Sequence, residues 1–249
     1  MTMTETLFEP TVRPKTLGET VLTQIKETLL NGKLMPGEQI SLRSTAKALG
    51  VSVMPVREAV NQLVAESALE VAPNRAVRVP VLTHAQFTEI TQIRLQVEGF
   101  AVAQACENIS SELCNTLDTL NDELAQAMVM ATDTDDLVSL NKQLHFMVYE
   151  ASGMPMLVRI IESLWLRIGP ILNYDLHSGS ERTQNKIAVG HHKKMIDGLR
   201  EKDPGMAIEG LHNDIQTAYE HISMKTYQAT VTPFANNTLH WFYMQNFGG

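Results

Sequence analysis

The stretch SLRSTAKALGVSVMPVREAVNQLVAE, residues 41–66, decides the fold of the first part of the chain. Ser41 is suited to cap the segment that follows it, and Gly50 ends that segment, because glycine readily adopts the left-handed conformation that closes a helix. Ser52 then caps a second helix, and Pro55 falls in its first turn, where proline is tolerated. Two short helices joined by a tight glycine-containing turn predict a helix-turn-helix.

The flanking sequence adds a helix before this motif and a ribbon after it. Residues 17–31 repeat apolar side chains at helical spacing, and LMPGEQIS (34–41) combines a Pro-Gly turn with a short strand. Downstream, LEVAP (69–73) and AVRVPV (76–81) flank an Asn-Arg pair, which predicts a β-hairpin that would form a wing. We therefore expect a flexible N-terminus over 1–14 and a winged helix-turn-helix domain over 15–81.

The remainder of the chain predicts an antiparallel all-helical bundle of six or seven helices. Ser, Asp, Gly and Pro breaks separate segments with helical periodicity. The approximate spans are 83–107, 110–130, 135–152, 154–173, 181–200 and 204–226. We place this second domain at 82–228. The tail 229–249 is rich in aromatic residues, which suits either a flexible end or an arm packed across a dimer partner.

Composition excludes several protein classes. The chain has 249 residues, of which 44% are hydrophobic and 19% charged, and this globular composition excludes collagen-like, low-complexity and wholly disordered proteins. No apolar run reaches the roughly 18 residues of a membrane span, and the N-terminus lacks the apolar core of a signal peptide. Two cysteines, Cys106 and Cys114, cannot make a disulfide framework and read as structural thiols. We expect a cytoplasmic protein without a membrane partner.

The net charge of −8 is divided unequally along the chain. Residues 1–80 hold nine Lys and Arg against eight Asp and Glu, a net of +1, whereas residues 81–249 hold 11 against 20, a net of −9. An asymmetry of this kind indicates two functions on one chain. The net charge of the whole chain argues against a nucleic-acid partner, because such proteins usually have a basic surface. The first 80 residues are slightly basic, so the argument does not apply to them.

The first domain resembles the winged helix-turn-helix of the GntR superfamily of transcriptional regulators. The resemblance rests on G-x-L-x-P-G-E (32–38), ALGVS (48–52) and PVREAV–QLVAE (55–66), in that order and spacing. The helical region resembles the C-terminal FCD-type domain of the FadR-like branch, so the resemblance covers roughly residues 15–225. It implies a homodimeric repressor of a pseudo-palindromic operator in double-stranded DNA, controlled by a small-molecule effector.

In the family that the first domain resembles, arginines at the positions of Arg43 and Arg57 contact DNA. Arg57 lies one turn into the recognition helix, where its fork can bind guanine O6 and N7, and Arg43 is the second matching position. Val53 stands where relatives carry a third arginine, and it could pack on a thymine methyl. Ala76 replaces the wing glycine, and alanine tolerates positive φ poorly. The wider set of candidate contacts is Arg43, Ser44, Thr45, Lys47, Ser52, Val53, Pro55, Arg57, Asn74, Arg75 and Arg78. The alternative is that the arginines form local ion pairs with Glu58 or Glu66.

The resemblance also implies a metal bound by an aspartate and three histidines in the bundle. The matching positions here are Asn141, His145, His192 and Asp214, so two of the four ligand types are kept. Helical spacing turns all four side chains inward, which predicts a shared polar pocket. Two histidines, a carboxylate and an amide could hold zinc or nickel. The alternative is a pair of hydrogen-bonded core histidines around water or an organic ligand.

Arg94 and Glu98 stand four residues apart on the first bundle helix. A buried guanidinium there suits a carboxylate-bearing effector through a bidentate pair, and relatives often place an arginine at this position. The alternative is a simple helix pair between the two side chains. Arg167 and Tyr174 are further effector-pocket candidates, His177 is a weaker one, and Trp165 reads as core or interface.

Two other functional classes remain open from the residues alone. A helical metal-dependent enzyme could use His145, His192 and Asp214, although no nucleophile–base pair or glycine-rich phosphate loop accompanies them. An architectural DNA binder without an effector would leave the inward polar groups unexplained, because burying them is costly unless they are satisfied. We favour the DNA-binding regulator over both.

Overall fold

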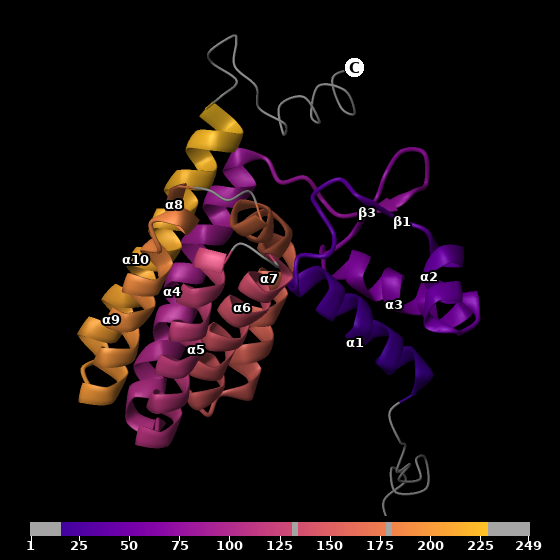
Figure 1. Cartoon of the computed structure of the whole chain (residues 1–249). Coiled ribbons are helices and arrows are strands. Elements are labelled where there is room, and N and C mark those ends of the chain that lie inside the picture. The colour runs from indigo at the N-terminus through magenta and orange to yellow at the C-terminus, as the bar shows by residue number, and fades with distance from the viewer. Residues whose placement is uncertain (1–15, 131–133, 178–180, 229–249) are drawn as a thin grey trace, which may run out of the picture.

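The computed structural model describes residues 16–130, 134–177 and 181–228. A small unit of three helices and a short sheet lies beside a larger helical bundle (Figure 1). The predicted N-terminus 1–14 and aromatic tail 229–249 lie outside the described residues. No helix in the described part of the chain is long and apolar enough to cross a membrane.

The N-terminal unit is the predicted winged helix-turn-helix. Its elements are α1 (Leu17–Leu30), β1 (Gln39–Ile40), α2 (Leu42–Leu49), α3 (Val53–Ala65), β2 (Glu70–Val71) and β3 (Val77–Arg78). The sheet order is β1-β3-β2 with both pairs antiparallel, so the wing hairpin adds to the strand before α2. Apolar residues at helical spacing on α1 and α3 form the core of this unit, and Val21, Leu29, Val56 and Leu63 are almost completely buried.

Local capping explains where these helices begin and end. The Ser41 side chain accepts from the Ser44 backbone N–H at 3.3 Å, and Gly50 ends α2 with a φ of 66°, as predicted. Ser52 occupies the N-cap position of α3, but its side chain makes no capping hydrogen bond. The serine hydroxyl at the start of the recognition helix is therefore not used by the helix itself.

The wing turn is closed by Asn74 and not by a glycine. Asn74 Oδ1 accepts from the Ala76 N–H at 3.0 Å, which is the side-chain turn that asparagine favours. The left-handed residue of the turn is Arg75, with a φ of 63°, whereas Ala76 has no positive φ. The strain that we expected at Ala76 is therefore absent, because the position that needs positive φ is one residue earlier.

The C-terminal domain is the predicted helical bundle. Its helices are α4 (His84–Asn108), α5 (Ser111–Met130), α6 (Thr134–Ala151), α7 (Pro155–His177), α8 (Glu181–Gln184), α9 (Ile187–Glu201) and α10 (Pro204–Ser223), followed by a π-helical turn, η1 (Met224–Gln228). The predicted helix over 181–200 is two helices, because Lys186 adopts a left-handed φ of 53° between them. Cys106 and Cys114 are buried free thiols, and burial raises the pKa of both.

Two glycines bring α9 and α10 unusually close together. A Cβ atom at Gly210 would lie 2.4 Å from the backbone nitrogen of Met195, and one at Gly198 would lie 2.3 Å from that of Ala207. Any side chain at either position would push the helices apart, because real Cβ atoms do not approach backbone so closely. This contact sets the spacing between His192 on α9 and Asp214 on α10.

Candidate functional site

The predicted DNA contacts lie mainly on exposed surface of the winged domain. On α2, α3 and the turn between them, the exposed candidates are Arg43, Ser44, Lys47, Ser52 and Arg57, whereas Thr45, Val53 and Pro55 are half-buried. Within the described residues neither Arg43 nor Arg57 forms an ion pair. Glu66, one of the two partners considered for them, instead pairs with Lys26 at 3.2 Å. Val53 packs against the domain core, so only part of its side chain faces outward. The guanidinium of Arg57 is therefore open to a ligand.

The wing places its residues in two different environments. Asn74 and Arg75 are exposed at the tip of the hairpin. Arg78 lies in β3, where its Nε donates to Glu70 Oε1 of β2 at 2.6 Å. The tip residues can reach a nucleic acid freely, whereas a phosphate contact by Arg78 would compete with its pair across the hairpin.

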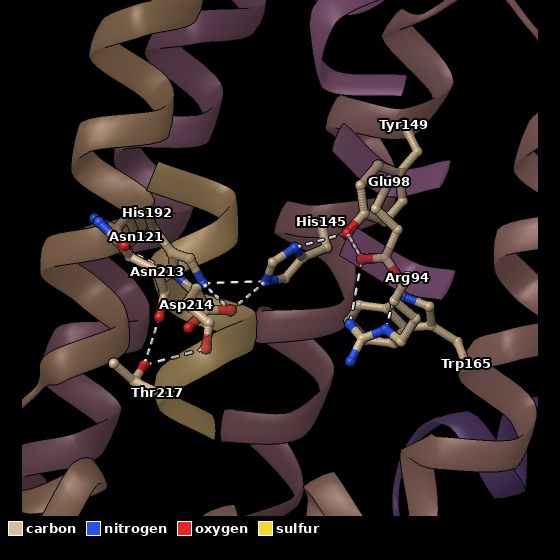
Figure 2. A network of polar contacts seen from close by, with 10 residues as sticks. All are labelled: Arg94, Glu98, Asn121, His145, Tyr149, Trp165, His192, Asn213, Asp214 and Thr217. Atoms are coloured by element: carbon tan, nitrogen blue, oxygen red, sulfur yellow. Dashed lines mark hydrogen bonds and ion pairs between the residues drawn. The ribbon is translucent and has the colours of Figure 1, made fainter. Parts of the chain in front are cut away.

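Three helices of the bundle bring His145, His192 and Asp214 to one point. His145 lies on α6, His192 on α9 and Asp214 on α10, and all three side chains are almost completely buried. The two Nε2 atoms are 3.1 Å apart, and Asp214 Oδ2 lies 3.3 Å from His145 Nε2 and 3.6 Å from His192 Nε2 (Figure 2). The shared polar pocket predicted from helical spacing therefore has a defined centre.

The outer nitrogen of each histidine is fixed by a further hydrogen bond. His145 Nδ1 lies 3.0 Å from Tyr149 Oη, and His192 Nδ1 lies 3.3 Å from Asn121 Oδ1 (Figure 2). The Asn121 amide is oriented by its Nδ2, which donates to the Val189 carbonyl at 3.0 Å. Its oxygen must then accept from His192.

The partners of Tyr149 determine the tautomer of His145. Burial, followed by the charge of Glu98, raises the pKa of Tyr149 well above its ordinary value, so the phenol keeps its proton. Tyr149 donates that proton to Glu98 Oε2, and its oxygen is left to accept from His145 Nδ1. Both histidines therefore carry hydrogen on Nδ1 in their neutral form and turn the Nε2 lone pair toward the centre. This is the tautomer that a metal ligand requires.

Glu98 is the buried anion of an adjoining network. Arg94 Nε donates to Glu98 Oε1 at 2.6 Å and Nη2 to Oε2 at 3.2 Å, and Trp165 Nε1 donates to Oε1 at 3.1 Å. Burial lowers the pKa of Arg94, but the charge and hydrogen bonds of Glu98 more than offset it, so that the pKa is raised overall. The guanidinium also lies over the Trp165 ring, 5.0 Å from its centroid. Arg94 and Glu98 thus form the helix pair that was the alternative to an effector contact, and this pair is buried.

A small cavity joins the Arg94 network to the histidine cluster. Its volume is about 20 Å³, and the residues around it are Arg94, Asn141, His145, Trp165, Leu172, Leu176, Asp214, Ile215 and Ala218. Arg167 does not line it: its Nε donates to the Glu66 carbonyl at 3.1 Å, at the end of α3. The side chains of Tyr174 and His177 lie outside the described part of the chain. The cavity holds little more than one water molecule as it stands.

Sequence reasoning missed Asn121 and Tyr149. Tyr149 follows His145 by four residues, and this spacing could have indicated a partner on the same helix face. Asn121 lies on α5, far from either histidine in sequence, and only the packing of α5 against α9 brings it to His192. Trp165, read as core or interface, also donates a hydrogen bond into the network.

A winged helix-turn-helix joined to a helical domain with a buried polar cavity defines a ligand-responsive DNA-binding regulator. Two family models match in this order, "Bacterial regulatory proteins, gntR family" over residues 17–79 and "FCD domain" over residues 89–217. The chain belongs to the GntR family, in the FadR-like branch that carries an FCD domain.

Individual relatives agree with this assignment. The "HTH-type transcriptional regulator McbR" of Escherichia coli (strain K12) is 35% identical over 179 residues, which cover 72% of this chain and 80% of the relative. The solved structure of E. coli McbR/YncC superposes with a TM-score of 0.77 at 31% identity, covering 87% of this chain and all of that one. The "Gluconate operon transcriptional repressor" of Bacillus subtilis (strain 168) is 23% identical over 82% of this chain and 86% of its own length.

These findings decide between the functional classes. The matching relatives are transcriptional regulators and repressors, so the protein is a transcriptional regulator with an effector-binding domain and not an enzyme. The alternative of a helical metal-dependent enzyme built on His145, His192 and Asp214 has no support among them. The FCD domain likewise favours a regulator with an effector over a purely architectural DNA binder.

Proposed function

We propose that the chain is a homodimeric repressor that binds a pseudo-palindromic operator and is released by a small metabolite. The observation that carries the DNA part is the exposed guanidinium of Arg57, which forms no ion pair with any described residue, on a recognition helix whose other face packs in a buried core. A dimer presents two such helices to successive major grooves, which is why a two-fold protein prefers a two-fold site. Its place of action would be the cytoplasm, where a chromosomal operator lies.

The dimer has support from the exposed surface of α4. Ile93 and Phe100 stand seven residues apart on one side of this helix and are 41% and 49% exposed. Large apolar side chains that share a helix face and meet water are typical of a surface that another protein covers. A second copy of the chain is the partner that a symmetric operator requires.

The operator assignment is tested by selecting genomic DNA fragments with the purified protein and sequencing them. In a shift assay with a selected fragment, Arg57→Ala should abolish specific binding while the variant stays folded and dimeric, because base contacts and not phosphate contacts carry the sequence preference. Arg159→Ala, which removes an exposed arginine from the bundle, is the matched control and should bind as the parent does. Normal operator affinity in Arg57→Ala would contradict the assignment.

We further propose a divalent metal, zinc or nickel, held by His145, His192 and Asp214, with Asn141 as an oxygen donor on the same cavity. Ligand atoms on a tetrahedral zinc ion with bonds near 2.0–2.1 Å stand about 3.3 Å apart. The three separations here are 3.1, 3.3 and 3.6 Å. In the tautomers given above, both Nε2 lone pairs and the Asp214 carboxylate face one point, which is the arrangement that a metal ion binds.

The effector that suits this pocket is a small carboxylate. Arg94 uses Nε and Nη2 on Glu98, and its Nη1 forms no hydrogen bond within the described residues. That nitrogen and the proposed metal would both attract an anionic oxygen in the same cavity. The buried Arg94–Glu98 pair is electrically neutral. The metal would therefore supply the positive charge that attracts the carboxylate, and the Arg94 Nη1 donor would orient it.

Metal analysis of the purified protein tests the site. After incubation with zinc or nickel and desalting, the parent should retain about one ion per chain, and His145→Ala should lose it, because one of its ligand nitrogens is removed. His84→Ala, which removes an exposed histidine at the start of α4, is the control and should retain the ion. Equal metal content in the parent and in His145→Ala would contradict the proposal.

A further inference from the structure

One helix of the bundle closes the ends of two helices of the DNA-binding domain. Asn173 Nδ2 of α7 donates to the carbonyls of Leu29 at 3.5 Å and Leu30 at 3.3 Å, at the end of α1. Six residues earlier, Arg167 Nε donates to the Glu66 carbonyl at 3.1 Å, at the end of α3. The last carbonyls of a helix have no partner within the helix, so α7 caps both α1 and the recognition helix. A cation at Arg167 also suits the negative end of the α3 dipole.

The contact at α1 is tightly packed as well as hydrogen-bonded. Asn173 is 5% exposed, and Leu29 and Leu30 beside it are buried. Gly32, just past the end of α1, leaves room for Asn173, since a Cβ atom at Gly32 would lie 2.6 Å from the Asn173 Cβ atom. A shift of Asn173 would therefore be felt directly by α1, because close-packed interfaces transmit displacement instead of absorbing it.

The other side of α7 forms a wall of the effector cavity. At about 100° per residue, Trp165, Leu172 and Leu176 fall on one side of the helix and Arg167 falls on the opposite side. The first three line the cavity beside Arg94. Pro170 lies between the two halves of α7 and cannot donate the hydrogen bond that would tie this turn to the preceding one. The half that carries Leu172, Asn173 and Leu176 is thus less firmly held to the rest of α7.

We propose that α7 carries the effector signal, with Arg167 and Asn173 as the positioning residues that hold the DNA-binding domain. This rests on the proposed function, since it requires an occupant in the cavity beside Arg94. A cavity of about 20 Å³ cannot accept a metabolite without moving its walls. Displacement of Leu172 and Leu176 carries Asn173 with them and shifts the capped end of α1. Arg167 lies before Pro170 and still holds the end of α3, so α1 moves against the recognition helix on which it packs. The recognition helix then loses the orientation that a two-fold operator requires.

The test replaces the unidentified effector by added bulk in the cavity. Ala218 is 6% exposed and lines the cavity from α10, so that Ala218→Leu adds bulk to the cavity that Leu172 and Leu176 line from α7. Ala188→Leu adds the same volume at a buried position on α9 that does not line the cavity, and it is the matched control. Operator affinity is measured by shift assay with a fragment selected from genomic DNA.

The expected result is a non-additive double-mutant cycle, in which the effect of Ala218→Leu on operator affinity depends on the α7 side chain. Ala218→Leu should weaken operator binding about tenfold in the parent, within the usual range of coupling between sites. In a background of Asn173→Leu, which keeps the branched side-chain skeleton but removes the donor, the same substitution should change affinity by less than about twofold. Arg167→Met is a second background with the same expectation, and urea unfolding of every variant separates lost coupling from lost folding.

Two results overturn the inference. One is an additive cycle, in which Ala218→Leu weakens operator binding equally in the parent, in Asn173→Leu and in Arg167→Met. The coupling between the cavity and the DNA-binding domain would then not depend on these two α7 side chains. The other is an effect of Ala188→Leu as large as that of Ala218→Leu. The parent and Arg57→Ala in the same assay report the proposed operator binding separately, so an additive cycle overturns only the coupling through α7.

Discussion

At the scale of single residues, Glu98 organises the buried polar network. It is completely buried, and its described partners Arg94, Tyr149 and Trp165 all donate hydrogen bonds to it. A buried anion surrounded only by donors is stable as long as each donor stays satisfied. Through Tyr149, the same anion fixes the tautomer of His145, so one carboxylate serves both the arginine and the histidine cluster.

Glu98→Gln should be among the most destabilising single changes in the bundle. The glutamine amide would leave the Arg94 charge buried without its anion, and breaking such a pair costs about 3–5 kcal/mol. Urea unfolding would measure this loss against Glu123→Gln, an exposed change on α5 that should be nearly neutral. The double variant Arg94→Leu/Glu98→Leu should lose less than Glu98→Gln alone, and a larger loss would contradict an electrostatic cause.

At the scale of the elements, most helix boundaries could be predicted from capping residues and from residues that end helices. Ser41, Gly50 and the Asn-Arg turn of the wing marked the ends of their elements because these local conformations depend on the residues themselves. The break between α8 and α9 was missed, since it depends on Lys186 in a left-handed conformation that lysine does not favour. The role of Asn121 was missed for a related reason, because it depends on how α5 packs against α9.

The sequence predicted the histidine–aspartate cluster of the pocket better than it predicted which α7 residues line the cavity. The inward faces of three helices placed His145, His192 and Asp214 together because helical periodicity alone turns them to the core. Arg167 was also assigned to the effector pocket, but α7 faces two partners, and sequence periodicity does not tell which side meets the cavity and which meets the other domain.

Two glycines with the same backbone conformation should respond differently to alanine. Gly32 and Gly50 have φ values of 68° and 66°, and a Cβ atom at Gly50 meets nothing within 4 Å. Gly50→Ala should therefore cost roughly 1–2 kcal/mol for the left-handed conformation alone. Gly32→Ala should cost about 1–3 kcal/mol more, because its Cβ would overlap Asn173. Equal losses in urea unfolding would mean that the two domains separate at this contact easily.

At the scale of the whole molecule, charge is divided between the two domains. Residues 1–80 carry a net of +1 and residues 81–249 a net of −9. A nearly neutral DNA-binding domain attached to an acidic bundle gains little from non-specific attraction to phosphate, so specific binding leans on placed side chains. Each exposed cation on α2 and α3 should thus have a measurable and separate share in the salt dependence.

Lys47→Ala should weaken binding to operator and to unrelated DNA by the same factor. If Lys47 contacts one phosphate, its removal lowers the slope of log affinity against log salt by about one and leaves sequence preference intact. Fluorescence anisotropy with both DNAs at several salt concentrations measures this directly. Glu89→Ala removes an exposed charge from α4 and should leave the slope unchanged. An unchanged slope in Lys47→Ala would remove that residue from the set of contacts.

The narrow cavity beside Arg94 also has a kinetic consequence. At about 20 Å³ it cannot admit a metabolite until Leu172 and Leu176 move aside. Binding would then wait for a spontaneous opening, and the observed association rate would rise with effector concentration only until it reached the opening rate. Above that concentration, more effector would no longer shorten the delay before the operator is released. The timing of the response would then be a property of α7 and its packing.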